Sequence, residues 1–156
     1  MQAPALSEAH RQLERLVGNW HGQERIHPSP FSDGGMARAR VHNVRALDGF
    51  AVVQDYEQTR DVPGMPPTFR GHGVFRVDVA NNQYVMHWFD TFGQTPAEFR
   101  GALEGDVLRV TQATAQGHVR ASWDLATPDR YQYTMEVSPD GEHWALFMEG
   151  SYVRDA

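Results

Sequence analysis

Beyond residue 17 the chain is a series of about ten short segments in which apolar and polar residues alternate, spaced roughly every 10–15 residues. Turns rather than helices separate them, and Asp-Gly, Asn-Asn and Pro-Asp pairs in these turns are typical of hairpins. Sequential hairpins without crossover helices predict an antiparallel meander. The predicted strands lie within residues 19–26, 36–46, 50–59, 69–79, 83–90, 98–103, 107–114, 118–126, 130–137 and 142–153.

Only the segment before these strands has a helical pattern. Ser7 can cap a helix, Leu13 and Leu16 follow at helical spacing, and Gly18 ends the pattern. A long meander leaves two unpaired edge strands unless it closes into a barrel. We therefore expect an all-β fold, an antiparallel up-and-down β-barrel of about ten strands, with one short N-terminal helix plugging one end. A two-sheet sandwich is the alternative. Length favours a single domain over residues 1–156.

Composition limits the partners of the chain. It is 40% hydrophobic and 22% charged, as in ordinary globular proteins, and has no Cys for disulfides, thiolate metal sites or a Cys nucleophile. The formal charge of −6 argues against nucleic acid, because binders of phosphate backbones usually carry a basic surplus. No apolar run approaches the ~20 residues of a membrane span, and no secretory signal is evident. We predict a cytoplasmic protein, and leave both monomer and homodimer open.

Several stretches resemble an uncharacterised bacterial family, domain of unknown function 1579. The Gly18-x-Trp20-x-Gly22 motif is also similar to the opening of lipocalins, fatty-acid-binding proteins and nitrobindins. The resemblance implies a lipocalin-like barrel with Trp20 packed at its closed end and a hydrophobic ligand or haem inside. It implies no activity, because none is established for the family. The stretches are LVGNWHGQERIHPSP, ALDGFAVVQDYEQ, GHGVFRVDVANNQYVMHWFDTFG, FRGALEGDVLRV and MEVSPDGEHWALFMEGSYVR.

The central strands carry aromatic residues with a few polar groups among them, which is the composition of small-ligand pockets. A barrel filled by its own side chains is the alternative. We predict a protein that binds a small apolar or amphipathic molecule without a cofactor, with Gln54 and Arg100 as further candidates for the pocket. The predicted ligand-binding residues are Tyr56, His72, His87, Trp88, Asp90 and Glu149.

Two glycines flank one of these residues, His72. Gly71 and Gly73 lie inside a predicted strand, where glycine usually marks a bend, a bulge or the close approach of another group. Curvature of a barrel wall explains them without any function.

A metal or haem is a further hypothesis. His42, His72 and His87 lie on three central strands, but no HxH or HExxH spacing brings them together. The resemblance to nitrobindins would require an axial His near the C-terminus, for which His118 and His143 are the candidates. Haem binding is therefore kept as an alternative, and no metal ligand is predicted.

Catalysis is the second alternative. A His beside a carboxylate, such as His72 or His87 with Asp90 or Glu149, could act as a general acid–base pair inside the barrel. No GxSxG motif and no Cys support a covalent nucleophile. The sequence does not decide whether the protein is an enzyme.

One strand carries a basic face. Arg38, Arg40 and His42 alternate with small residues, and two guanidinium groups would suit a carboxylate if they pointed inward. If they face solvent, they form only a charged strand surface.

Overall fold

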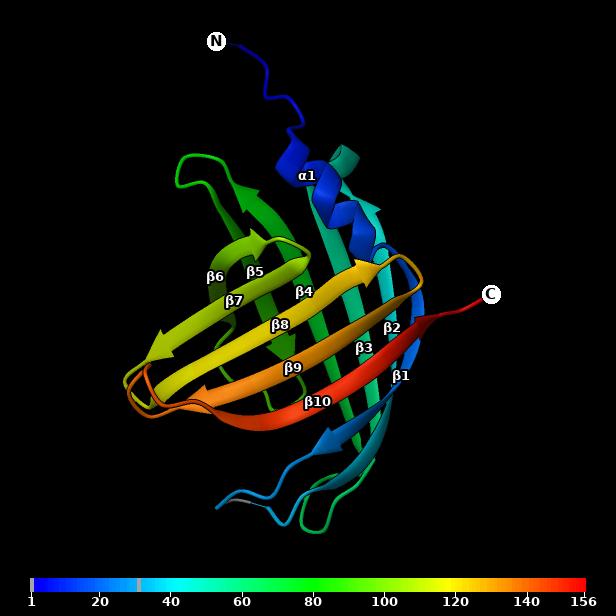
Figure 1. Cartoon of the computed structure of the whole chain (residues 1–156), viewed down its shortest axis with the longest axis vertical. Coiled ribbons are helices and arrows are strands. Elements are labelled where there is room, and N and C mark those ends of the chain that lie inside the picture. The colour runs from blue at the N-terminus through cyan, green and yellow to red at the C-terminus, as the bar shows by residue number, and fades with distance from the viewer. Residues whose placement is uncertain (1, 31) are drawn as a thin grey trace.

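The protein is described by a computed structural model over residues 2–30 and 32–156. A short helix, α1 (Glu8–Leu13), continues as a 3-10 turn over Glu14–Leu16 and lies across one end of a barrel (Figure 1). The barrel strands are β1 (Gly18–Ile26), β2 (Gly35–Ala46), β3 (Ala51–Asp61), β4 (Thr68–Asp78), β5 (Gln83–Asp90), β6 (Ala97–Glu104), β7 (Val107–Thr114), β8 (Gly117–Thr127), β9 (Arg130–Ser138) and β10 (Ala145–Arg154).

The sheet closes on itself. Each strand pairs antiparallel with its neighbours in sequence, and β1 pairs with both β2 and β10, which places Trp20 opposite Val41 on one side and Arg154 on the other. Closure satisfies the backbone groups that two edge strands would leave unpaired. The predicted ten-stranded up-and-down barrel with one N-terminal helix is confirmed, and the sandwich alternative is wrong.

Alternation along each strand separates the interior from the outer surface. In β2 the small residues Ala37, Ala39 and Val41 are buried, whereas Arg38 and Arg40 between them are exposed. The basic face of this strand is therefore a solvent-facing surface. Small residues on the inner face leave room for larger side chains from the opposite wall.

The helical segment closes one end of the barrel. Leu13 and Leu16 are buried against it, and the carbonyl of Leu16 accepts hydrogen bonds from Trp20 Nε1 at 2.9 Å and Asn43 Nδ2 at 2.8 Å. Ser7 precedes the helix as predicted, and its backbone N–H donates to Nδ1 of His10 at 3.0 Å. Trp20, 1% exposed, is thus part of the closed end, as the sequence predicted.

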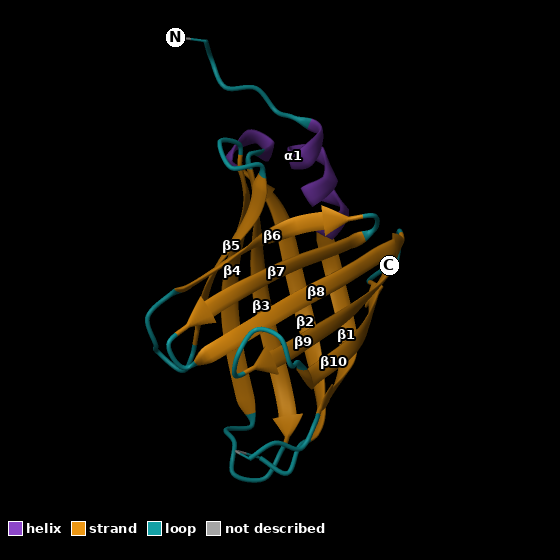
Figure 2. Cartoon of the chain, turned by 60° about the vertical axis from the view of Figure 1, so that its left-hand side comes forward, coloured by secondary structure: helices purple, strands orange, loops and turns teal. Residues whose placement is uncertain are grey.

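The other end of the barrel carries the loops that join β1 to β2, β3 to β4 and β5 to β6 (Figure 2). In the described part of the chain, no helix has the length and apolar character needed to cross a lipid bilayer.

Candidate functional site: a cavity inside the barrel

The barrel encloses a cavity of about 330 Å³, a size at the small end of ligand pockets. Trp88, Met86 and Phe99 line it from β5 and β6, and Trp123 and Tyr133 line it from β8 and β9. Loop residues at the end away from α1 also contribute, among them Met65 and the exposed Phe92. The closed end is filled by the core around Trp20, so the cavity opens toward the opposite loops.

Trp88 is positioned by the neighbouring strand β4 and by a carboxylate. Its ring lies over Gly71 of β4, where an added Cβ would overlap the indole, and beside Gly73, where an added Cβ would make an ordinary contact with it at 3.4 Å. Its Nε1 donates to Oδ2 of Asp90 at 2.9 Å, and Oδ1 of the same carboxylate accepts from the backbone N–H of Phe92 at 2.9 Å. Gly71 thus admits the close approach of this side chain, which is one of the roles that the sequence left open for a glycine inside this strand.

A second polar group lies on the inner face of β1 and contacts side chains of β3 across the strand β2 between them. Glu24 is fully buried, and its Oε1 accepts hydrogen bonds from the Tyr56 hydroxyl at 2.5 Å and from Gln58 Nε2 at 3.2 Å. Burial raises the pKa of Glu24 above its ordinary value of 4.5, because desolvation outweighs these hydrogen bonds. Burial also raises the pKa of Tyr56 well above 10, so its hydroxyl remains a donor at neutral pH.

This raised pKa makes stability depend on pH. The folded protein holds the Glu24 proton at pH values where the unfolded chain has released it, so its contribution is complete below pH 4.5 and is lost as the pH rises through the folded-state pKa. Glu24→Gln has no proton to lose. We expect its free energy of unfolding, relative to that of the wild type, to increase as pH rises from 4.5 toward alkaline values, measured by urea unfolding across that range.

Tyr56→Phe sharpens the same test. It removes a donor to the Glu24 carboxylate, so it should raise the pKa of Glu24 further and extend the loss of stability to higher pH. Parallel pH curves for the wild type and Glu24→Gln would show that Glu24 does not carry this dependence.

Three of the six predicted site residues line the cavity: Tyr56, Trp88 and Asp90. Gln54, named as a further candidate, lines it too. Ligand binding by these residues stays a prediction, but they can reach a molecule inside the barrel.

The other three, His72, His87 and Glu149, do not line the cavity. His72 is on the outside of β4, where its Nδ1 lies 2.8 Å from Oδ1 of Asp55. Glu149 is on the outside of β10, with Oε2 3.3 Å from Nε2 of His27. The reason is that successive side chains of a strand point to opposite faces. Each of these three residues is next to an inward-facing residue, as His72 is next to Gly71, and therefore points outward.

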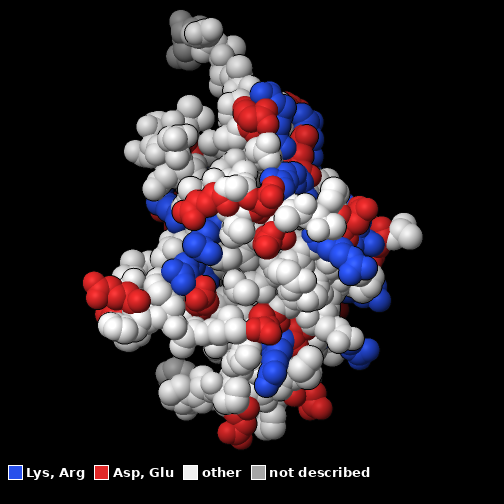
Figure 3. Space-filling model, in the orientation of Figure 1, with Lys and Arg blue, Asp and Glu red and all other residues white. Residues whose placement is uncertain are grey.

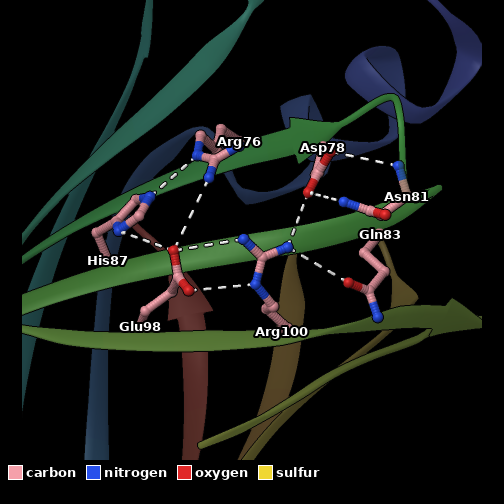
Figure 4. Close-up of polar contacts among 7 residues, drawn as sticks. All are labelled: Arg76, Asp78, Asn81, Gln83, His87, Glu98 and Arg100. Carbon is pink, nitrogen blue, oxygen red and sulfur yellow. Dashed lines mark hydrogen bonds and ion pairs between the residues drawn. The ribbon is translucent and has the colours of Figure 1, made fainter.

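His87 belongs to a network on the outer face of β4, β5 and β6 (Figure 4). Nε of Arg76 donates to Nε2 of His87 at 2.9 Å, and Glu98 lies between His87 and Arg100. Arg100, the remaining candidate for the pocket, donates to Oδ2 of Asp78 at 2.8 Å. Hydrogen bonds from Asn81 and Arg100 lower the pKa of Asp78 to about 2. Figure 3 shows acidic and basic side chains interspersed over the face that it presents.

The histidines considered for a metal or haem lie outside the cavity as well. No His is among the described residues that line it. His42 contacts Asn19 on the outer surface, and His143 pairs with Asp140 at 2.6 Å in an exposed turn. His118 lies near the ring of Trp144. A His on the cavity wall that could serve as an axial haem ligand is therefore absent from residues 2–30 and 32–156.

His–carboxylate pairs, which could serve acid–base catalysis, also lie outside the cavity. Every His–carboxylate ion pair in the described ranges joins side chains that do not line the cavity. The interior has carboxyl, amide, phenol and guanidinium groups instead.

Sequence reasoning missed several interior polar residues, among them Glu24, Gln58 and Arg60. A signal for the first was present, because Glu24 is four residues after Trp20 and so shares its strand face. Gln58 and Arg60 continue the inward face of Gln54 and Tyr56, and Arg60 lies beyond the predicted end of that strand at residue 59. The structure extends β3 to Asp61, which brings Arg60 into the barrel wall.

The model of one protein family matches residues 5–154, nearly the whole chain, under the description "Protein of unknown function (DUF1579)". The chain belongs to the DUF1579 family. This confirms the resemblance seen in the sequence. No curated protein matches the chain.

Solved structures share the fold of this DUF1579 protein. Rv2717c from M. tuberculosis superposes with a TM-score of 0.68 at 15% identity, covering 97% of this chain and 100% of that one. The S-type phycobiliprotein lyase CPES from Guillardia theta gives 0.65 at 12% identity, covering 96% and 94%. A de novo designed fluorescence-activating β-barrel gives 0.51 at 13% identity, covering 96% and 100%. At these identities the likeness shows the fold alone.

Proposed function

We propose that this DUF1579 protein binds a small, largely apolar or amphipathic molecule inside its barrel. The observation that carries the proposal is the cavity itself, about 330 Å³ in volume, walled mainly by aromatic and aliphatic side chains with a few polar groups among them. Such a composition binds an apolar body by burial and orients it by sparse hydrogen bonds. A core that only stabilised the fold would fill this space, because protein interiors pack with few voids.

Trp88, Tyr56 and Asp90 are the contacts that we assign to the ligand. The rings of Trp88 and Tyr56 lie edge to face at 6.0 Å, and both line the cavity. Asp90 holds the indole from the mouth side. Two of the structural neighbours are a phycobiliprotein lyase and a fluorescence-activating designed barrel, and this likeness supports a small-molecule role for the interior. A cytoplasmic location and the absence of a nucleic-acid partner stay predictions from composition.

Filling the cavity tests the proposal. Ala121 of β8 lines it, and Ala121→Phe would place a ring in the space assigned to the ligand. We expect a loss of affinity of at least about tenfold for 2-naphthamide and decanamide, since the added ring occupies their volume. The measurement is isothermal titration calorimetry with both neutral probes.

Ala113→Phe is the matched control. Ala113 is exposed on the outer face of the adjacent strand β7, so the same substitution there leaves the cavity unchanged. Equal affinities of Ala121→Phe and the wild type would place the bound probe outside the barrel and overturn the proposal. Circular dichroism and the melting temperature establish that both variants are folded.

A further inference from the structure

We infer that the molecule bound in the barrel carries a carboxylate, and that Arg60 binds it; this inference rests on the proposed function. The apolar body would lie against the Trp88 side of the cavity, with the anionic group nearer the mouth. The evidence is the state of the Arg60 side chain, which is a cation in the wall of an otherwise mostly apolar cavity.

Arg60 is buried, at 8% exposed, and only part of its hydrogen-bonding capacity is used. Its Nε donates to the carbonyl of Pro66 at 2.8 Å, and one Nη donates to Oε1 of Gln58 across a longer 3.4 Å. The other Nη is buried and has no hydrogen-bond partner in the described protein. A guanidinium remains charged in a protein, so this buried N–H donor requires an acceptor that the described protein does not supply.

No carboxylate among residues 2–30 and 32–156 forms an ion pair with Arg60. The ion pairs of the structure do not include it. Of the two interior carboxyl groups, Asp90 uses both oxygens, whereas Glu24 has Oε2 buried without a hydrogen-bond partner. Asp90 accepts from Trp88 and from the backbone of Phe92. Glu24 is separated from Arg60 by the Gln58 amide, whose nitrogen donates to Glu24 while its oxygen accepts from Arg60.

A buried cation without a counter-ion is costly, and burial accordingly lowers the pKa of Arg60. An incoming carboxylate would accept from the free Nη and offset this cost, with the charge-assisted geometry that guanidinium groups favour. A neutral ligand could accept one hydrogen bond but would leave the charge uncompensated. The residue therefore discriminates in favour of an anion.

Two aromatic rings hold the guanidinium of Arg60 at the open end of the cavity. Its central carbon lies 5.3 Å from the ring centroid of Phe69 and 5.7 Å from that of Phe92, distances typical of cation–π contacts. Arg60 is near the end of β3 away from α1, and Met65 and Phe92 line the cavity there. The deeper wall is apolar, with Met86 and Phe99. This arrangement suits an amphipathic acid, whether its body is a ring or a short chain.

Two isosteric pairs of probes test the inference: 2-naphthoate with 2-naphthamide, and decanoate with decanamide. Each pair keeps the body and changes only the charge of the head group. In the wild type at neutral pH we expect at least one carboxylate to bind roughly 10- to 100-fold more tightly than its amide, by calorimetry. In Arg60→Gln this preference should shrink to about threefold or less. Arg70→Gln, an exposed arginine on the outside of β4, is the matched control and should keep the preference.

The outcomes separate the two proposals. Equal binding of acids and amides by the wild type would overturn the carboxylate inference and leave the proposed function standing; this comparison needs no variant to fold. A preference that persists in Arg60→Gln would overturn the assignment to Arg60. Failure of all four probes to bind would overturn the proposed function together with the inference.

Discussion

Trp20→Ala should lower the free energy of unfolding by about 3–5 kcal/mol, the usual cost of removing a large buried aromatic side chain. Trp20 is 1% exposed, its ring packs edge-on against Tyr131 at 4.8 Å, and the guanidinium of Arg154 lies 4.1 Å from the indole centroid. Its loss leaves a void at the closed end of the barrel. It also removes the hydrogen bond that the indole N–H donates to the carbonyl of Leu16. Urea unfolding monitored by circular dichroism measures the change.

Trp144→Ala is the control for this substitution. Trp144 is only partly buried and stacks on Arg120, whose guanidinium carbon lies 4.1 Å from the ring centroid. Its removal should cost about 1 kcal/mol or less, the value of a surface cation–π contact. Similar losses for the two variants would mean that Trp20 does not hold the closed end of the barrel.

Gly71→Ala should reduce ligand affinity by at least about tenfold while the barrel remains folded. A Cβ at position 71 would overlap the six-membered ring of Trp88, which borders the cavity, and we expect the ring to be displaced into it. That movement breaks the hydrogen bond from the indole to Asp90 and fills the volume assigned to the ligand. The cost in stability should be about 1–3 kcal/mol, as for other overpacked sites. Titration with 2-naphthoate measures the loss of affinity, and urea unfolding measures the cost in stability.

Gly73→Ala provides a matched comparison two residues along the same strand. There the added Cβ would lie 3.4 Å from the nearest atom of the Trp88 ring, an ordinary contact that leaves the indole in place. Its affinity should stay within about threefold of the wild type. If both glycine variants bind equally well, Trp88 is not a wall of the binding site.

The strands were predictable because they depend on local pattern. In β9, Tyr131, Tyr133 and Met135 alternate with polar residues, and the turns around it contain Pro, Asp and Gly. Such alternation and turn chemistry extend over only a few residues, so they can be recognised in the sequence without knowledge of the fold. The helix before Trp20 was predictable for the same reason, since the spacing of Leu13 and Leu16 lies within a single element.

The inward face was harder to predict where both faces of a strand carry large or polar groups. In β4, Gly71 and His72 lie on opposite faces, and the strand's own sequence does not say which face is inside. Histidine contacts ligands more often than glycine does, so the sequence favoured His72. The closed barrel turns Gly71 and Gly73 inward because Trp88 of β5 packs over them. That contact is between strands, so the pattern of β4 alone does not reveal it.

Alternation and turns were sufficient for a ten-stranded meander, because each is a property of neighbouring residues, and the resemblance of the Gly18–Gly22 motif to other barrels placed Trp20 at the closed end. The binding cavity depended on tertiary structure. Closure and register bring Glu24 against Tyr56, 32 residues away, and leave Arg60 buried between Phe69 and Phe92 without a carboxylate. A strand's own sequence sets which residues share a face, but only pairing with other strands decides which face is inside and what it meets there.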